Sequence, residues 1–578
     1  MSVTAADRSL AVYRRAVEKE FAFLKGTEAI EHLHARSLPL PDGAGLLVPV
    51  CELHADDEQT IALLARWRDA NQLAFPTRFE VTDEGTRTWL RRTLLDVPDR
   101  ILFLVADRHG HPIGHLGFAH CLARDGVLEI DNVVRGEPAA PGLMGVALDE
   151  LCEWAEDMFL PEAIVLRVLD DNEHALAFYR RHGWVEVGSE PAADGLRYLV
   201  LERRVERAVG DELILTAGPM IGPREPSYAL DAARHGWNRH HSDYVTAFER
   251  GVAEIVGCRH ALATSSGTGA IHLALAALGL GPGDEVIVPD LTWVATASAV
   301  AYTGATPVFA DVEPDSWCLD AASAEALVTA RTKAIVPVHL YGHPADMDAV
   351  LAVADRHGLH VVEDAAPALG AEVRGRRVGA LGDAGAFSFQ GAKLVVSGEG
   401  GMLCTDDDEL YERARLLWLH GCSEPDRFWV TELGYKYRLS NVQAAVGLGQ
   451  VERADELVEA KRRIFSWYEE ELDGVDEVEL NRETSWARSI YWMPSILLRE
   501  DAPVGRDRLR VLLRERHNVD TRSVFPPIGT YPIWGRAHEP GPVAARIGAR
   551  ALNLPSGVRL RREHVAHVGA AVRAELGR

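Results

Sequence analysis

The segment from residue 258 to residue 314 alternates short apolar runs with helical runs, and this alternation constrains the fold more than any other feature. It reads as a strand, a Ser/Gly/Thr turn and an alanine-rich helix, followed by strand, helix and strand. Strands joined by helical crossovers pair in parallel and lie buried between helices. We therefore predict an α/β fold with a mostly parallel sheet for this part of the chain.

The chain has 578 residues, which is too long for a single hydrophobic core. Its first residues carry apolar positions at helical spacing and then prolines and glycines that stop a helix. We expect the apolar face of this segment to dock on the next domain or on a partner subunit. The predicted parts are a helical extension (1–44), an α/β domain with a mixed sheet (45–207), a short stiff junction (201–215) and a second domain (211–578). The second domain is predicted to have a large part (about 225–455) and a smaller C-terminal α/β part (about 456–578).

Composition argues against several classes of protein. A net charge of −25 does not suit a protein that binds the phosphate backbone of nucleic acids. No apolar run approaches the roughly 20 residues that span a bilayer. The seven cysteines include no CxxC pair and the histidines are dispersed, so we predict reduced thiols in a cytoplasm and no metal site.

Lys393 lies between the apolar run 386–389 and the glycine cluster 398–401. Poor solvation lowers the pKa of a lysine, as an amine needs if it is to condense with a carbonyl near neutral pH. A lone lysine in a loop is more often an ordinary surface residue. The chemical meaning of Lys393 therefore depends on the groups near it.

Two further groups follow predicted strands. Residues 265–269 read SSGTG at the start of a helix, where amides and the helix dipole suit a dianionic phosphate, although Ser and Thr are also the usual capping residues. Asp364 ends another apolar strand, where parallel sheets bind ligands, and it could pair with a protonated ring nitrogen or cap the turn 365–370. Phosphate cradle, carboxylate and lysine in this order describe a site for pyridoxal phosphate.

Residues 211–578 resemble the fold-type I sugar aminotransferases of the DegT/StrS group, which aminate keto-sugar nucleotides and some keto-cyclitols. The matching stretches include SSGTGAIHLAL, VVEDAAPALGA, GAFSFQGAKLVVSGEGGML and YKYRLSNVQAAVGLGQ. The resemblance implies a Schiff-base lysine (Lys393), a pyridinium partner (Asp364), an aromatic stacked on the ring (Trp293) and phosphate ligands (Gly267, Thr268, Ser388).

Two positions depart from this family. Pro367 replaces a glutamine that usually contacts the phenolic oxygen of the cofactor, and proline has no side-chain donor. Lys436 stands where many relatives have an asparagine that reaches the phosphate of the neighbouring subunit, and a lysine could neutralise that phosphate as a point charge. The resemblance therefore implies at least a homodimer.

The earlier domain contains a strand, a loop with Gly142 and Gly145, and then a helix. Backbone amides receive a pyrophosphate in such a loop, although these turns are common. The later run DNEHALAFYRRHGW resembles the end of the GNAT acyl-CoA transferase fold, and this implies that Asn172 contacts coenzyme A and Tyr179 protonates the departing thiolate. Tyr179 could instead be a core aromatic.

The loop of this domain departs from the GNAT pattern, since Ala139 and Met144 occupy its first and last positions. Glu129 and Asp131 alternate along a strand, so both could face the cleft as a general base, or both could face solvent. The general base stays open.

Together the two resemblances predict a bifunctional enzyme. It would transfer an amino group from glutamate to a keto sugar, expected to be nucleotide-linked, and then N-acylate the new amine with acetyl-CoA. A keto-cyclitol as substrate, or a GNAT-like domain that serves as a non-catalytic binding or assembly module, are the alternatives. A regulator of transcription does not fit, because neither a DNA-binding helix pair nor a basic surface is present.

Overall fold

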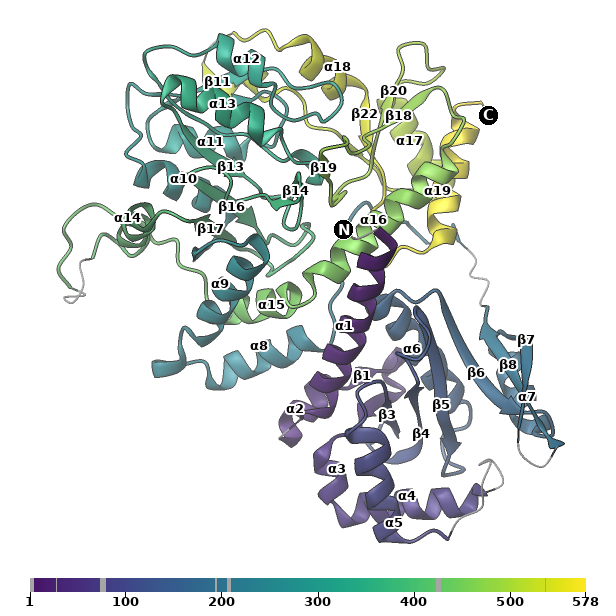
Figure 1. Cartoon of the computed structure of the whole chain (residues 1–578). Coiled ribbons are helices and arrows are strands. Elements are labelled where there is room, and N and C mark those ends of the chain that lie inside the picture. The colour runs from purple at the N-terminus through teal and green to yellow at the C-terminus, as the bar shows by residue number, and fades with distance from the viewer. Residues whose placement is uncertain are drawn as a thin grey trace. The chain divides into compact units, whose positions relative to one another are not determined.

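The computed structural model describes residues 5–27, 29–72, 80–192, 195–204, 209–210, 212–422, 428–535 and 537–577. The chain folds as two compact units, one made of residues 1–207 with 222–230 and the other of residues 208–221 with 231–578 (Figure 1). Of the predicted junction 201–215, residues 205–208 and 211 lie outside the described residues.

In the described part of the first unit, eight strands form one mixed sheet in the order β1-β2-β3-β4-β5-β6-β8-β7. The strands are β1 (Leu38–Pro39), β2 (Gly45–Pro49), β3 (Ile101–Asp107), β4 (Pro112–Ala119), β5 (Val127–Arg135), β6 (Ala163–Leu169), β7 (Trp184–Pro191) and β8 (Arg197–Arg203). The helices are α1 (Ala5–Lys25), α2 (Ile30–Arg36), α3 (Glu52–Asp56), α4 (Glu58–Ala70), α5 (Asp83–Trp89), α6 (Leu143–Phe159), α7 (Glu173–Arg181) and the first residues of α8 (Arg224–His235).

The neighbouring strands β5 and β6 separate part-way along their length. They pair in parallel from Val127 with Ala163 to Ile130 with Leu166. Beyond this point β5 carries a bulge against β4, because Gly117 pairs with Asp131 whereas His115 pairs with Val134. A bulge bends its strand, and here it accompanies an opening in the sheet.

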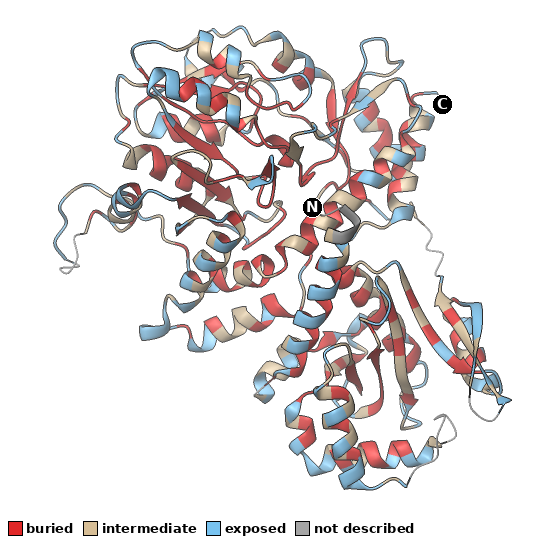
Figure 2. Cartoon of the chain, in the orientation of Figure 1, coloured by how far each residue is buried: buried red, intermediate tan, exposed pale blue. Residues whose placement is uncertain are grey.

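The second unit is built on the predicted α/β sheet, and burial is concentrated on its strands (Figure 2). In its described part the order is β11-β10-β12-β13-β16-β17-β9, and β17 runs antiparallel to both neighbours whereas the other pairs are parallel. The strands are β9 (His260–Thr264), β10 (Glu285–Pro289), β11 (Thr306–Ala310), β12 (Thr332–Ile335), β13 (His360–Asp364), β16 (Ala384–Ser388) and β17 (Gly401–Thr405).

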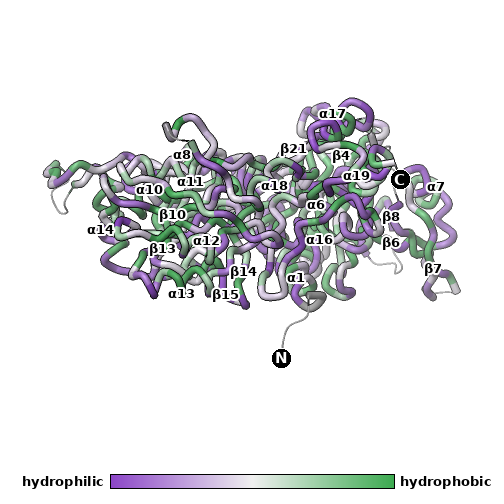
Figure 3. The backbone as a smooth tube through the Cα atoms, turned by 90° about the horizontal axis from the view of Figure 1, so that it is seen from above, coloured by the Kyte–Doolittle hydropathy of each residue, from purple (hydrophilic) through white to green (hydrophobic). Residues whose placement is uncertain are grey.

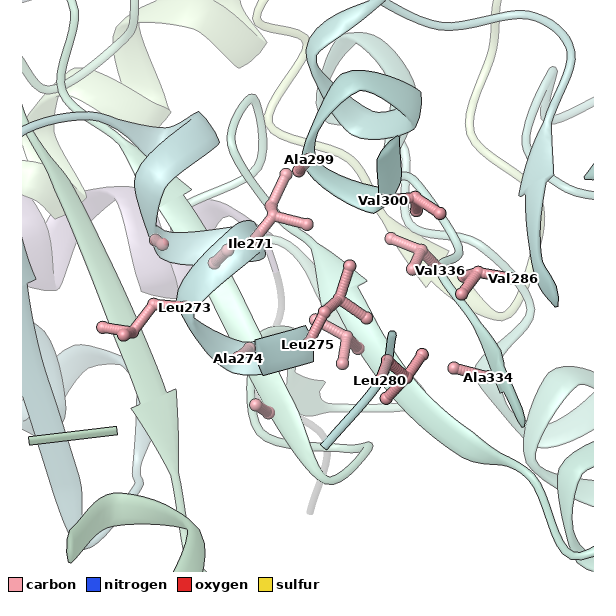
Figure 4. Close-up of a cluster of buried hydrophobic side chains, with 14 of the residues drawn as sticks. Ile271, Leu273, Ala274, Leu275, Leu280, Val286, Ala299, Val300, Ala334 and Val336 are labelled. Atoms are coloured by element: carbon pink, nitrogen blue, oxygen red, sulfur yellow. The ribbon is translucent and has the colours of Figure 1, made fainter. Parts of the chain in front are cut away.

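Helices cover this sheet and bury one large hydrophobic cluster. Leu275 of the alanine-rich helix lies in the same cluster as Val286 and Val336 (Figure 4). The small side chains of this helix let it approach the strands closely. The helices are α9 (Asp243–Val256), α10 (Gly267–Ala277), α11 (Ala295–Tyr302), α12 (Ala321–Ala326), α13 (Met347–His357), α14 (Asp408–Trp418) and α15 (Asn441–Val451).

The C-terminal part of this unit has its own sheet and its own core, as the sequence predicted. Its elements are α16 (Ala454–Glu471), β18 (Val478–Leu480), β20 (Ser495–Leu498), α17 (Arg506–His517), β21 (Arg522–Ser523), α18 (Pro542–Arg550), β22 (Ala551–Asn553) and α19 (Arg562–Glu575). A small ribbon joins β14 (Glu372–Val373), β15 (Arg376–Arg377) and β19 (Ala487–Arg488).

Hydrophobic and hydrophilic residues interleave along the backbone (Figure 3). Within the described residues, no helix combines the length and apolar character needed to cross a membrane.

Candidate active sites

The carboxyl ends of β9, β13 and β16 bring the predicted polar groups of the second unit to one edge of its sheet. Asp364 at the end of β13 pairs with Ala386 of β16. Two residues further on, Ser388 is level with Gly401 of β17, which in turn is level with Thr264 of β9. The turn that begins at residue 265 therefore lies on the same edge as Ser388 and Asp364.

Asp364 is only 5% exposed. One carboxylate oxygen accepts a hydrogen bond from Thr296 Oγ1 at 2.7 Å, and the other accepts one from the Ala366 amide at 3.1 Å. Burial raises the pKa of Asp364, while the two hydrogen bonds and the charge of Lys393 act in the opposite direction. The turn contact predicted as the alternative thus uses one oxygen, and Thr296 holds the other.

Lys393 lies on the loop after β16 and is partly buried. Its Nζ lies 4.1 Å from the centroid of the Trp492 ring. Burial lowers the pKa of Lys393 to about 8, against the opposing charge of Asp364. This agrees with the poor solvation predicted from the flanking sequence.

A second lysine holds the backbone of Trp492, the residue over whose ring Lys393 lies. Trp492 donates from Nε1 to the Ala392 carbonyl at 2.8 Å, and its own carbonyl accepts a hydrogen bond from Lys461 Nζ at 3.0 Å. Lys461 also donates to Ser556 Oγ at 2.9 Å and to the Ser556 carbonyl. Burial lowers the pKa of Lys461 to about 7.

The predicted phosphate cradle is the N-terminus of α10. Ser266 caps the helix by accepting a hydrogen bond from the Gly269 amide at 3.0 Å, which confirms the capping alternative for this residue. The first amides of a helix, here those of Gly267 and Thr268, have no partner within it. A Cβ added at Gly267 would stand 2.8 Å from the Cβ of Ser388, so only glycine allows this close approach. These groups fit a bound phosphate.

Three other residues singled out from the sequence differ in exposure. Trp293 is 58% exposed, with its ring 5.7 Å from that of Phe525. Its carbonyl accepts a hydrogen bond from the Thr296 amide at 3.3 Å. Lys436 is exposed, and Pro367 is buried in the turn after β13.

The first unit contains a cavity of about 440 Å³ at the opening between β5 and β6. Asn172 and Tyr179 both line it, as do Glu129 and Asp131, so the two carboxylates share one wall. Asn172 caps α7 by accepting a hydrogen bond from the Ala175 amide at 3.1 Å. Tyr179 is 8% exposed, and burial together with the charge of Asp131 raises its pKa far above the ordinary value. Its phenol is therefore a neutral proton donor.

The two glycines predicted for the acyl-CoA loop differ in their surroundings. Gly142 is the N-cap residue that precedes α6, with φ 85°, a conformation that favours glycine, and open space surrounds the position of a Cβ. Gly145 packs directly against the ring of His182, whose Nδ1 lies 2.9 Å from Asp149 Oδ2. Packing alone thus requires a glycine at 145.

Among the described residues, no group of three or more His, Cys, Asp or Glu side chains is arranged to hold a metal ion.

Several site residues carry no signal in the sequence. Thr296 is a single threonine at the start of a helix, and Trp492 and Lys461 belong to stretches that read as core. The closest available hint is that Thr296 follows Trp293 by three residues.

Comparisons with known proteins identify both domains. Residues 219–573 match the DegT/DnrJ/EryC1/StrS aminotransferase family, and residues 64–184 match the acetyltransferase (GNAT) family. GDP-perosamine synthase of Caulobacter vibrioides is 42% identical over 361 residues, which are 62% of this chain and 97% of that protein. UDP-N-acetyl-3-dehydro-alpha-D-glucosamine 3-aminotransferase of Acidithiobacillus ferrooxidans is 40% identical over 334 residues, 57% of this chain and 88% of that protein.

Among solved structures, DesI in the presence of its TDP-sugar product matches with a TM-score of 0.60 and 34% identity, covering 64% of this chain and 95% of that one. The chain therefore belongs to the DegT/DnrJ/EryC1/StrS aminotransferase family and carries a GNAT acetyltransferase domain ahead of its aminotransferase domain.

Proposed function

We propose that this enzyme makes an amino sugar and then N-acylates it. The second unit would transfer an amino group from glutamate to a nucleotide-linked keto sugar, and the first unit would acylate the new amine from acetyl-CoA. The names of three relatives support a nucleotide-linked substrate, since they refer to GDP-, UDP- and TDP-linked sugars.

The observation that carries the first activity is a lysine of lowered pKa beside a buried aspartate and a helix N-terminus. These residues fit pyridoxal phosphate, with the Gly267 and Thr268 amides and Ser388 for its phosphate, Asp364 for its ring nitrogen and Trp293 for its ring face. When bound, this cofactor supplies an aldehyde for condensation with amines and a ring that accepts electrons.

The residues of the chain supply the proton transfers. Lys393 takes the proton from the α-carbon of the amino donor and returns a proton to the product, because its lowered pKa leaves its amine unprotonated in about a tenth of molecules at pH 7, far more than for a solvated lysine. Asp364 keeps the ring nitrogen protonated only while its carboxylate is ionised. Thr296 favours that ionised form.

In the first unit, the amine of the acceptor forms a bond to the thioester carbonyl carbon, and the carbon–sulfur bond breaks. Tyr179 donates its proton to the departing sulfur. Asn172 and the loop at Gly142 would hold coenzyme A.

We propose a homodimer in which the exposed Lys436 serves the phosphate of the neighbouring subunit. Sedimentation of the purified protein at twice the chain mass would support this assembly, and a monomer with full activity would exclude it.

The direct test is to incubate the full-length protein with glutamate, acetyl-CoA and a panel of keto-sugar nucleotides, and to weigh the products. An acylated amino sugar is expected. An aminated product that is never acylated would instead support a binding or assembly module, which the Ala139 and Met144 departures favour. Turnover of a keto-cyclitol with no turnover of any sugar nucleotide would contradict the substrate class.

Capture of the cofactor by the cofactor-free enzyme should depend on pH through Lys393. With a pKa of about 8, the unprotonated fraction rises about fivefold between pH 7 and pH 8 and levels off above pH 9. The measurement is the rate of appearance of visible absorbance after addition of pyridoxal phosphate. A rate that still climbs about sevenfold between pH 9 and pH 10 would show that Lys393 is an ordinary solvated lysine.

Thr296→Val should move the acid limb of the amination pH profile to higher pH by about one unit. The substitution removes a hydrogen bond that favours the charged form of Asp364, so the pKa of Asp364 rises further. The profile of kcat/KM between pH 5 and pH 9 measures the shift. Thr306→Val, at an exposed threonine on β11, is the matched control, and equal profiles for the two variants would refute the role of Thr296.

A further inference from the structure

We propose that the acceptor side of the cavity in the first unit binds a phosphate-bearing amine, and that Arg100 is the group that recognises its phosphate. The ligand class is a sugar amine linked to a nucleoside diphosphate. This inference rests on the proposed acylation activity and specifies the form in which the sugar is acylated.

Strand register places the reacting groups on one face of the sheet. Glu129 and Asp131 alternate with Ile130 on β5, and Glu129 is level with Val165 of β6, so Arg167 shares their face. Leu128 and Ile130 point to the opposite face and are buried in the core. The cavity is also lined by Arg68 and Trp89, which come from α4 and α5, and by Arg100.

The cavity has two chemically different ends. Asp131, whose charge helps to raise the pKa of Tyr179, and Tyr179 itself mark the end where the thioester would react. Glu129 lies two residues back along β5, about 7 Å away. Because Glu129 is level with Ala119 of β4, the residue after β4, His120, stands at this second end. There His120 Nε2 lies 2.9 Å from a guanidinium nitrogen of Arg100.

Arg100 is the source of positive charge at the second end. A guanidinium can only donate, so His120 Nε2 is the acceptor in this contact. Within the described residues, no carboxylate forms an ion pair with Arg100. By contrast, Arg167 is shared between Glu129 at 2.8 Å and Glu190 at 3.7 Å. Arg100 is thus a positive group that faces the cavity and is not neutralised by a carboxylate, although the chain has a net charge of −25. Such a group favours an anionic ligand.

Another guanidinium lines the wall rather than the second end. Arg68 donates to Thr86 Oγ1 at 3.1 Å and lies 4.4 Å above the Trp89 ring. Burial lowers the pKa of His115 on β4 and the charge of Arg68 lowers it further, so Arg68 lies near His115, five residues before His120. Arg100 therefore contacts the phosphate, and a sugar ring bridges from it to the amine near Asp131.

The phosphates of coenzyme A are the other possible anions. The residues that line this cavity include none from α6, whose N-terminus is the predicted position of the cofactor pyrophosphate. KM values measured for the amine acceptor and for acetyl-CoA show which of these two substrates carries the phosphate that Arg100 binds.

The test uses the full-length protein and follows release of the coenzyme A thiol with two acceptors. One acceptor is a nucleotide-linked amino sugar, and the other is the same amino sugar as its methyl glycoside, without phosphate. Arg100→Ala should raise KM for the nucleotide-linked acceptor by about tenfold or more, since hydrogen bonds to charged groups have this strength. KM for the glycoside and for acetyl-CoA should stay unchanged. Of the two acceptors, only the nucleotide-linked one should bind more weakly when salt is added.

Arg108→Ala, in the exposed turn between β3 and β4, is the matched control, and an unchanged kcat with the methyl glycoside shows that the first unit of each variant is folded. Equal KM values for both acceptors in the unmodified enzyme would overturn the Arg100 site and leave acylation standing. An Arg100→Ala effect on acetyl-CoA would assign Arg100 to the cofactor instead. Release of no thiol with any acceptor would overturn the acylation activity and this inference together.

Discussion

Lys393→Ala should lower transamination by about 10⁴-fold while acylation of a supplied amino sugar continues at the unmodified rate. The substitution removes the amine that would bind the cofactor and carry the substrate proton, and general acid–base groups of this kind contribute up to about 10⁴-fold. Its lowered pKa and its place over Trp492 make Lys393 the best-suited amine at this edge of the sheet. Product mass in the presence of glutamate, and the visible absorbance of the purified protein, measure the loss.

Lys333→Ala serves as the matched control, because Lys333 is an exposed lysine on β12 of the same sheet. It should keep full amination and full visible absorbance. Amination that persists in Lys393→Ala, or absorbance that survives, would show that another group holds the cofactor.

Tyr179→Phe should lower acylation by about 10²-fold and leave amination intact. Phenylalanine retains the contact with Trp184, whose ring centroid is 6.1 Å from that of Tyr179, and removes only the hydroxyl that would protonate the leaving sulfur in the proposed reaction. The pKa of Tyr179 is raised by burial and by Asp131, so the phenol remains a proton donor throughout the range in which the amine is neutral. Thiol release at saturating acetyl-CoA is the measurement.

Tyr302→Phe, at an exposed tyrosine of the second unit, provides a control for the same chemical change. Full acylation by Tyr179→Phe would leave Tyr179 as a core aromatic, the alternative that its helical position allows. A loss of both activities would indicate disturbed folding rather than loss of an acid.

The edge of the second sheet was predictable because consecutive parallel strands end on the same side. Asp364, Ser388 and the turn after Thr264 each follow a run that reads as a buried strand, and register alone brings them together. Lys393 alone was not distinctive, and it was recognisable only in combination with the turn at residues 265–269 and with Asp364, which precede it on successive strand ends.

The groups that tune these residues were not predictable. Thr296 lies 68 residues from Asp364, and Trp492 lies 100 residues from Ala392. Such pairs depend on how distant segments pack, and no local period marks them. The same holds for Arg100, which follows a loop. Its contact with His120 arises only because β4 brings the two residues together.

The path of the backbone limits how this enzyme can be divided into separate proteins. The segment 222–230 returns to the first unit, where Arg224 donates to Glu20 of α1 at 2.9 Å and its guanidinium lies 4.5 Å from the Phe23 ring centroid. Both side chains are buried, and loss of one partner of such a pair costs about 3–5 kcal/mol. A gene split at residue 207 would therefore yield a first unit of lower stability. A stop codon placed after α8 would keep the pair of Arg224 and Glu20 within one chain.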